Sequence, residues 1–257
     1  MTTLCGYDGS PYAIEALEVA ATFARKRGDR LVVAQVLDVL GADEPAVLGR
    51  AQDELRAEVA RHTSPDDAEV RVISGEAVAA LAHLADDRRA GLVVIGARAL
   101  ARHDLSDWLE STALRLTSRL HHPVLIVRRR GPLLDAIAGR APLRVTLAVA
   151  PGRGARAVAW LEALSAHLLL TVDAVHVAAP HEEVDEVALA ETAGPHRVRV
   201  VRDERSLGCA IAEIAARDDA GLVVIGREKP PVLHRTKARA IVADCTTNVA
   251  CVPEDAP

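Results

Sequence analysis

The chain has 257 residues, of which 50% are apolar and 2% aromatic, and its formal net charge at pH 7 is −5. This length allows one large domain or two small ones, and an Ala-, Val- and Leu-rich apolar content is typical of helices packed on buried parallel strands. A negative charge with so few rings argues against a nucleic-acid-binding surface, because such surfaces are basic and stack bases on aromatic side chains.

The first half of the chain alternates predicted strands with predicted helices. Between the third and fourth strands, for example, Val78, Leu81 and Leu84 follow helical spacing. In chain order the strands are predicted at 4–7, 31–37, 70–73, 90–96 and 124–127, with a long Ala-rich helix at 12–27. Alternation of this kind indicates a parallel sheet with right-handed crossovers.

The second half of the chain repeats this order. The segment AGLVVIG at 90–96 returns unchanged at 220–226, and VRVI at 70–73 returns as VRVV at 198–201. The other strands of the second copy are predicted at 145–149, 169–177 and 249–252, with a helix at 155–167. We therefore interpret the chain as one α/β unit written twice.

The connection between the two copies is rich in Gly, Pro and Arg, which marks an exposed segment with room for a short helix. We predict a first domain at 1–130, a linker at 131–142 and a second domain at 143–257. Each domain is expected to hold a five-stranded parallel sheet flanked by helices.

Other sequence features exclude several classes of protein. No apolar stretch approaches the roughly 20 residues of a membrane-spanning helix, and the N-terminal MTTLCGYDGS has no basic segment followed by an apolar run. The four cysteines form no C-x-x-C pair, and no His/Cys cluster has metal spacing, so neither a zinc site nor a disulfide framework is expected. We expect a cytoplasmic protein that contacts neither membrane nor nucleic acid.

Three residues of the first copy are candidates for a binding site, since ligands of open parallel sheets lie beyond the carboxyl ends of the strands. Asp8 follows the first strand and either bonds a ribose hydroxyl or caps the next helix. Gly96 ends the fourth strand, where glycine either lets the backbone approach a phosphate or makes a plain turn. Ser111 lies near the start of a helix, whose free N–H groups can hold an anion.

With these residues the sequence resembles the universal stress protein family, through DGS at 8–10, VVIG at 93–96, Ser111, and HHPVLIV at 121–127. The resemblance spans nearly the whole chain, once per copy. It implies a tandem form with two Rossmann-like, adenine nucleotide alpha hydrolase-like domains. Some members of the family bind ATP through G-x2-G-x9-G-[ST], and others lack this pattern and bind no nucleotide.

Carried over residue by residue, the resemblance gives four positions of the first copy a role toward ATP. Asp8 matches the residue that contacts ribose, and Val36 matches the position whose backbone faces adenine. Gly96 matches the first loop glycine, and Ser111 matches the final Ser.

The loop between Gly96 and Ser111 departs from the family pattern. Ala99 replaces the second glycine, Glu110 stands where the last glycine belongs, and the loop is one residue longer. The methyl group of Ala99 hinders the approach of a polyphosphate to the backbone, and the negative charge of Glu110 repels it. Arg98 can offset part of that negative charge.

The second copy departs further from the pattern. Ala150 stands in the position of Asp8, and two prolines at 230–231 remove donor N–H groups soon after Gly226. The segment 235–237, RTK, is either an exposed basic turn or an anion site at a helix start. We expect ATP in the first domain only.

The resemblance implies a stress-response protein that is not an enzyme, since no Ser/His/Asp or Cys/His set can be assembled. We expect a scaffold or partner-binding module with degenerate nucleotide loops and an unknown protein partner. The alternative is an ATP-binding stress sensor that uses the first domain only. We also expect the two copies to pair as an intramolecular pseudo-dimer through strands 124–127 and 249–252, which would hide two sheet edges, and a homodimer stays open.

Overall fold

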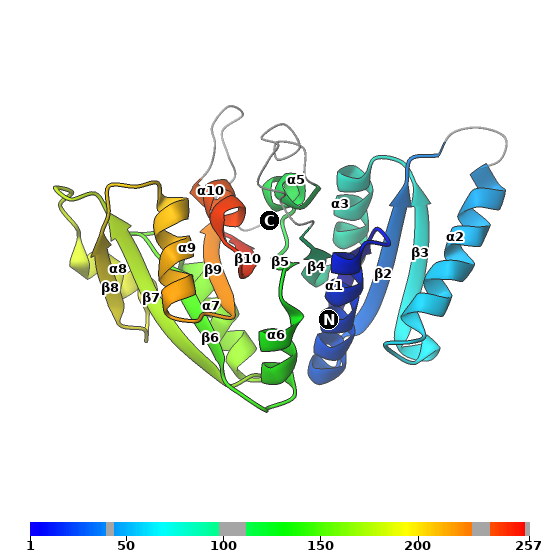
Figure 1. Ribbon diagram of the computed structural model, residues 1–257, viewed down its shortest axis with the longest axis horizontal. Helices are drawn as coiled ribbons and strands as arrows, with labels where there is room; N and C mark the ends of the chain where they lie inside the picture. The colour runs from blue at the N-terminus through cyan, green and yellow to red at the C-terminus, as the bar shows by residue number, and fades with distance from the viewer. Residues whose placement is uncertain (40–43, 98–111, 228–236, 255–257) are drawn as a thin grey trace. The chain divides into compact units, whose positions relative to one another are not determined.

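The computed structural model describes residues 1–39, 44–97, 112–227 and 237–254. It divides into two compact units, Met1–Arg130 and Gly131–Pro257 (Figure 1). The segment 131–142, predicted as a linker with room for a short helix, belongs to the second unit and contains most of helix α6 (Arg130–Ile137). Leu133, Ala136 and Ile137 of this helix are buried, so the segment contributes to a hydrophobic core.

The first unit is a parallel sheet whose described strands follow the order β3-β2-β1-β4-β5. Its elements are β1 (Thr2–Tyr7), α1 (Pro11–Arg27), β2 (Arg30–Leu37), α2 (Glu44–Val59), the 3-10 helix η1 (Pro65–Asp67), β3 (Ala68–Ser74), α3 (Ala77–Asp87), β4 (Ala90–Gly96), α5 (Thr112–Arg119) and β5 (Val124–Val127). The predicted five-stranded parallel sheet with flanking helices is confirmed for this unit.

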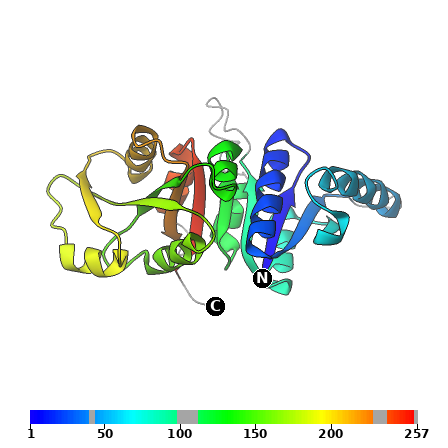
Figure 2. The same ribbon diagram turned by 90° about the horizontal axis from the view of Figure 1, so that it is seen from below.

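The second unit has the equivalent strand order, β8-β7-β6-β9-β10, and is also parallel throughout. After α6 its elements are β6 (Leu143–Ala148), α7 (Ala155–Ser165), β7 (Leu170–Ala178), α8 (Glu186–Ala193), β8 (Val198–Arg202), α9 (Leu207–Arg217), β9 (Leu222–Arg227), α10 (Lys237–Asp244) and β10 (Asn248–Pro253). Figure 2 shows α7 and α8 on one face of this sheet and α9 and α10 on the other.

The repeated AGLVVIG segment contributes an interior strand to each sheet, β4 in the first unit and β9 in the second. In β4 the side chains of Leu92, Val93 and Val94 are fully buried, and in β9 Val223 and Val224 are fully buried too. A strand covered on both faces by helices must be apolar on both faces, which explains a continuous rather than alternating apolar run. The duplicated sequence therefore specifies a strand that is buried on both faces in each unit.

Helix α1 begins and ends at residues that suit helix termini. The Ser10 hydroxyl accepts a hydrogen bond from the Ala13 N–H at 3.2 Å, Pro11 occupies the first turn, and Gly28 ends the helix with φ 68°. These features fix the first turn of α1 directly after β1.

The cysteines and the helix lengths can also be compared with what the sequence indicates. Cys5 in β1 and Cys251 in β10 are buried, and burial raises the pKa of the Cys5 thiol to about 12, so both act as small core residues. Among the described residues, no helix combines the length and the apolar character needed to cross a membrane.

Candidate functional site

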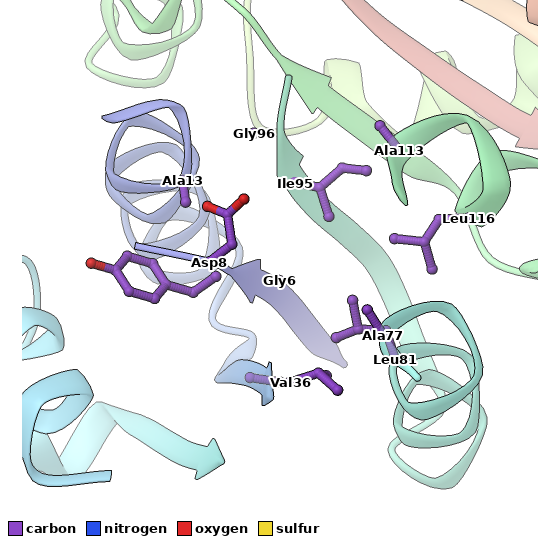
Figure 3. Close-up of a pocket in the computed structure, with 12 residues that line it drawn as sticks. Gly6, Asp8, Ala13, Val36, Ala77, Leu81, Ile95, Gly96, Ala113 and Leu116 are labelled. Atoms are coloured by element: carbon purple, nitrogen blue, oxygen red, sulfur yellow. The ribbon is translucent and has the colours of Figure 1, made fainter. Parts of the chain in front are cut away.

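A cavity of about 100 Å³ lies at the carboxyl ends of β1, β2 and β4 in the first unit (Figure 3). The first turn of α1, the start of α3 and helix α5 form its other walls. It is lined by Gly6, Tyr7, Asp8, Ala13, Ala34, Val36, Ala77, Leu81, Ile95, Gly96, Ala113 and Leu116. This is the edge at which open parallel sheets bind their ligands.

Asp8 supplies the carboxylate of the cavity. It is exposed, and in Figure 3 its carboxylate lies between Ala13 and Ile95. Its Oδ1 accepts a hydrogen bond from the Ser10 N–H at 3.0 Å, and Oδ2 has no hydrogen-bond partner in the described part of the chain. The alternative role predicted for Asp8, capping the next helix, is wrong, because Ser10 caps α1. One oxygen orders the turn, and the other is available to a hydroxyl group.

Val36 lines the same cavity as Asp8, from the carboxyl end of β2. The pairing of β1 with β2 ends at Tyr7 and Gln35, so Val36 is the first residue of β2 beyond the end of β1. Next to it the lining consists of small or aliphatic side chains, namely Ala34, Ala77, Leu81 and Leu116. A flat apolar ring suits such walls, since small-molecule sites are mostly apolar with a few placed polar groups.

The size of the cavity limits what it can enclose. Sites for drug-sized ligands usually have about 300–1,000 Å³, and an engineered cavity of about 150 Å³ holds benzene. The space of about 100 Å³ beside Asp8 is smaller than both, so it can enclose only part of a ligand, and the rest of a nucleoside would lie outside it.

Gly96 lines the cavity at the end of β4, but its lack of a side chain has a structural cause. A Cβ at this position would lie 2.5 Å from the Tyr12 carbonyl carbon and oxygen and 2.7 Å from the Ala13 nitrogen. The first turn of α1 thus packs directly on Gly96, and only glycine leaves room for that backbone. The requirement for glycine holds here without any phosphate.

Tyr7 is a lining residue that the sequence did not single out. Burial raises the pKa of its phenol, and the negative charges of Glu58 and Asp8 raise it further. The group is therefore neutral near pH 7 and can donate a hydrogen bond. The feature of the sequence that could have pointed to Tyr7 as a lining residue is its place at the end of the first strand, beside Asp8.

Asp8, Val36 and Gly96 come together on one cavity, whereas other predicted site residues cannot be placed. Arg98 and Ser111 lie outside the described residues. So do the first-copy substitutions Ala99 and Glu110 and the segment 230–236 of the second copy.

The corresponding edge of the second unit differs at the first strand. Ala150 takes the place of Asp8, and its N–H and carbonyl both bond Arg153, at 3.1 and 2.8 Å, closing a tight turn. The Gly152 N–H in that turn donates to the Thr192 hydroxyl of α8 at 3.0 Å. This loop therefore lacks a carboxylate and is bound to a neighbouring helix.

Comparisons with known proteins agree on one family. A sequence model described as the universal stress protein family matches residues 1–128. A universal stress protein of Thermus aquaticus is 32% identical over 135 residues, which are 49% of this chain and 98% of that protein.

Solved structures extend the likeness in fold. A universal stress protein from Archaeoglobus fulgidus matches with a TM-score of 0.77 at 15% identity, over 98% of this chain and 96% of that chain. A functionally unknown protein from Pseudomonas aeruginosa matches with a TM-score of 0.63 at 14% identity, over 98% and 92%. The likeness in fold therefore reaches both units.

Proposed function

The chain belongs to the universal stress protein family, and from this premise we propose that it is a non-enzymatic stress-response protein whose first unit binds an adenine nucleoside or nucleotide. One observation carries the proposal: Asp8 and Val36, the positions assigned to ribose and adenine, line the same cavity. A protein partner would then respond to whether the first unit has a ligand bound.

The charges of the cavity favour contact with the base and sugar. Among the described residues that line the cavity, Asp8 is the only acidic or basic one, and the raised pKa of Tyr7 keeps its phenol protonated. A carboxylate accepts hydrogen bonds from ribose hydroxyls but repels phosphate oxygens. Affinity is therefore expected to come mainly from the nucleoside part of the ligand.

A role without catalysis is supported by the chemistry of the same two groups. A general base must be unprotonated and within hydrogen-bond reach of its target, and a tyrosine of raised pKa is protonated at neutral pH. Asp8 accepts the Ser10 N–H, and no hydrogen bond described in the structure joins its carboxylate to a hydroxyl or thiol group that it could activate.

The first experiment measures thermal stability with ATP and with adenosine at millimolar concentration. Binding to the native state raises Tm, because stabilisation grows as RT ln(1 + [L]/Kd). We expect a rise in the parent that disappears in Asp8→Ala and persists in Asp87→Ala, which removes an exposed carboxylate on α3. No rise with either ligand in the parent would contradict the proposal.

The second candidate function is a nucleotide-free scaffold that binds a protein partner. It is favoured by Gly96, whose absent side chain is explained by packing against α1 alone. The substitutions Ala99 and Glu110 point the same way. This candidate predicts that Ala99→Gly with Glu110→Gly gains ATP binding that the parent lacks, and tight binding by the parent would exclude it.

A further inference from the structure

The chain crosses the start of α7 immediately after β10 ends. There the Glu254 carboxylate accepts hydrogen bonds from two consecutive backbone N–H groups, those of Arg156 and Ala157, each at 3.3 Å. The Glu254 N–H donates to the Arg227 carbonyl at 2.9 Å, which fixes its backbone at the end of β9. The sheet thus fixes the backbone of Glu254, and the start of α7 binds its carboxylate.

Helix α7 needs such a group because its own sequence supplies none. The N-cap residue is Gly154, which has no side chain and makes no capping hydrogen bond. The first N–H groups of a helix have no partner within the helix, and they carry its positive pole. Glu254, almost 100 residues away in sequence, satisfies two of these groups with a negative charge.

Gly226 is the residue that makes room for this carboxylate. The atoms nearest to a Cβ at position 226 would all belong to Glu254, with Oε1 in direct overlap, Cδ at 2.9 Å and Cγ at 3.1 Å. At the equivalent Gly96 the overlap is with the backbone of α1 itself. The same glycine of AGLVVIG therefore serves two purposes: in the first copy it admits a helix, and in the second it admits a side chain.

We propose that Glu254 is a built-in anion that caps α7 and closes the N-terminal pole of this helix to anionic ligands. The carboxylate occupies the N-terminal pole of α7 beside the carboxyl end of β9, so a phosphate cannot take the same N–H groups while Glu254 is in place. The proposal concerns the second unit and is independent of what the first unit binds.

A double-mutant cycle tests the contact itself. Glu254→Ala is expected to lower Tm by roughly 2–8 °C, the shift that follows loss of one helix cap. Gly226→Ala should also lower the Tm of the parent, because its Cβ overlaps the Glu254 carboxylate. In the Glu254→Ala background the same substitution should lower Tm at most half as much, because the overlapping atoms are gone. If Gly226→Ala alone does not fold, recovery of folding in the double variant gives the same answer.

Gly96→Ala is the matched control for that cycle. Its overlap is with backbone atoms of α1, so its effect on Tm should add to that of Glu254→Ala without interaction. Additive Tm losses for Gly226→Ala and Glu254→Ala, or a double variant as unfolded as Gly226→Ala, would overturn the assignment of Glu254.

Inorganic phosphate tests the closure. We expect phosphate to raise the Tm of Glu254→Ala by more than it raises that of the parent, since the emptied helix pole can then take an anion. Glu191→Ala, which removes an exposed carboxylate on α8, controls for the general stabilising effect of phosphate. The first unit is unchanged in all three proteins, so its own response cancels. Equal phosphate responses in all three would contradict the closure.

Discussion

Arg89 and Asp219 occupy equivalent positions in the two copies, one residue before the AGLVVIG segment. Both residues adopt left-handed backbone conformations, with φ of 47° and 49°, although neither is a glycine. Each follows the last residues of a helix, α3 or α9, where a left-handed residue commonly ends the helix and glycine is usually found. The duplication has thus preserved a strained backbone together with the strand that follows it.

Relief of this strain can be measured at Arg89. The left-handed conformation costs an L-residue about 1–2 kcal/mol, and glycine loses about 0.5–1 kcal/mol more backbone entropy than alanine on folding. Arg89→Gly should therefore raise the free energy of unfolding by roughly 0.5–1 kcal/mol in denaturant titrations. Arg89→Ala is the control, because it removes the exposed side chain and keeps the strain. Equal stability of the two variants would refute the explanation.

At the scale of single residues, the sequence predicts where site residues lie better than it predicts what they do. Asp8, Val36 and Gly96 each lie at or next to the carboxyl end of a parallel strand, so their meeting at one edge could be predicted. The reason for a glycine at 96 could not, because it depends on how closely the first turn of α1 approaches. The role of Glu254 could not be predicted either, because it depends on the same kind of tertiary approach. The sequence does show that Gly154 offers no capping side chain to the helix that follows it.

Among the elements, β3 at the edge of the first sheet is covered by a side chain that imitates a neighbouring strand. The Gln52 amide on α2 donates from Nε2 to the Val70 carbonyl at 2.8 Å and accepts the Val72 N–H through Oε1 at 3.0 Å. Exposed edge strands invite pairing with other chains. Gln52 therefore both stabilises the fold and protects this edge from pairing with another chain.

Removal of the Gln52 side chain should affect both properties. We expect Gln52→Ala to lower the free energy of unfolding by about 1–2 kcal/mol, since two hydrogen bonds are lost. Sedimentation velocity should detect increased self-association. Glu54→Ala, on the exposed side of the same helix, should change neither. Loss of stability without self-association would show that Gln52 does not protect the edge.

One ion cluster lies at the β2–β3 strand pair and another at the β7–β8 pair, and their central residues have opposite charges. In the first unit Glu69 pairs with Arg30, Arg71 and Arg88, with the Arg71 Nε 2.6 Å from Oε1. In the second unit the central residue is Arg199, which pairs with Asp173 and Asp218. Arg88 and Asp218 are equivalent positions next to the repeated strand, so the sign of the charge at the helix end has been exchanged.

The first cluster predicts a dependence of stability on pH. Burial alone would raise the pKa of Glu69, but the hydrogen bonds from Arg71 and Arg88 outweigh it and hold that pKa below its ordinary value of 4.5. A lowered folded-state pKa means that the contribution of Glu69 is complete above about pH 4.5 and is lost as the pH falls through the folded-state value.

Denaturant titrations between pH 7 and pH 3 check this dependence. Glu69→Gln should be less stable than the parent at pH 7 by roughly 1–3 kcal/mol, the usual worth of hydrogen bonds to a charged group. The difference should shrink toward pH 3. A difference that is constant over this range would show that the charge of Glu69 is not involved.

The elements themselves could be predicted closely where the sequence pattern is local. Strands 90–96 and 124–127 were predicted with the bounds that the structure gives. The repeated segment at 220–226 forms a strand at Leu222–Arg227 instead, because its partner β10 extends to Pro253 and pairs Arg227. Bounds that depend on a neighbouring strand are set by tertiary pairing and are not written in the segment alone.

For the whole molecule, the predicted pseudo-dimer of the two copies stays a prediction. If strand 124–127 pairs with its counterpart, the isolated first unit should expose that edge and associate with a second copy of itself. Light scattering on residues 1–129 should then give the mass of a dimer at micromolar concentration. A monomer under these conditions would contradict the pairing. A dimer of the intact chain would point to a second, separate interface.

The two units share a scaffold and differ at the edge where ligands bind. The first presents a carboxylate and an apolar cavity, and the second presents Ala150, a closed turn and a carboxylate held on α7. Calorimetric titration of the intact chain with adenosine and with ATP tests this asymmetry most directly. One site per chain is expected, lost in Asp8→Ala and retained in Asp87→Ala. Two sites, no site, or a site that survives Asp8→Ala would contradict the proposed function.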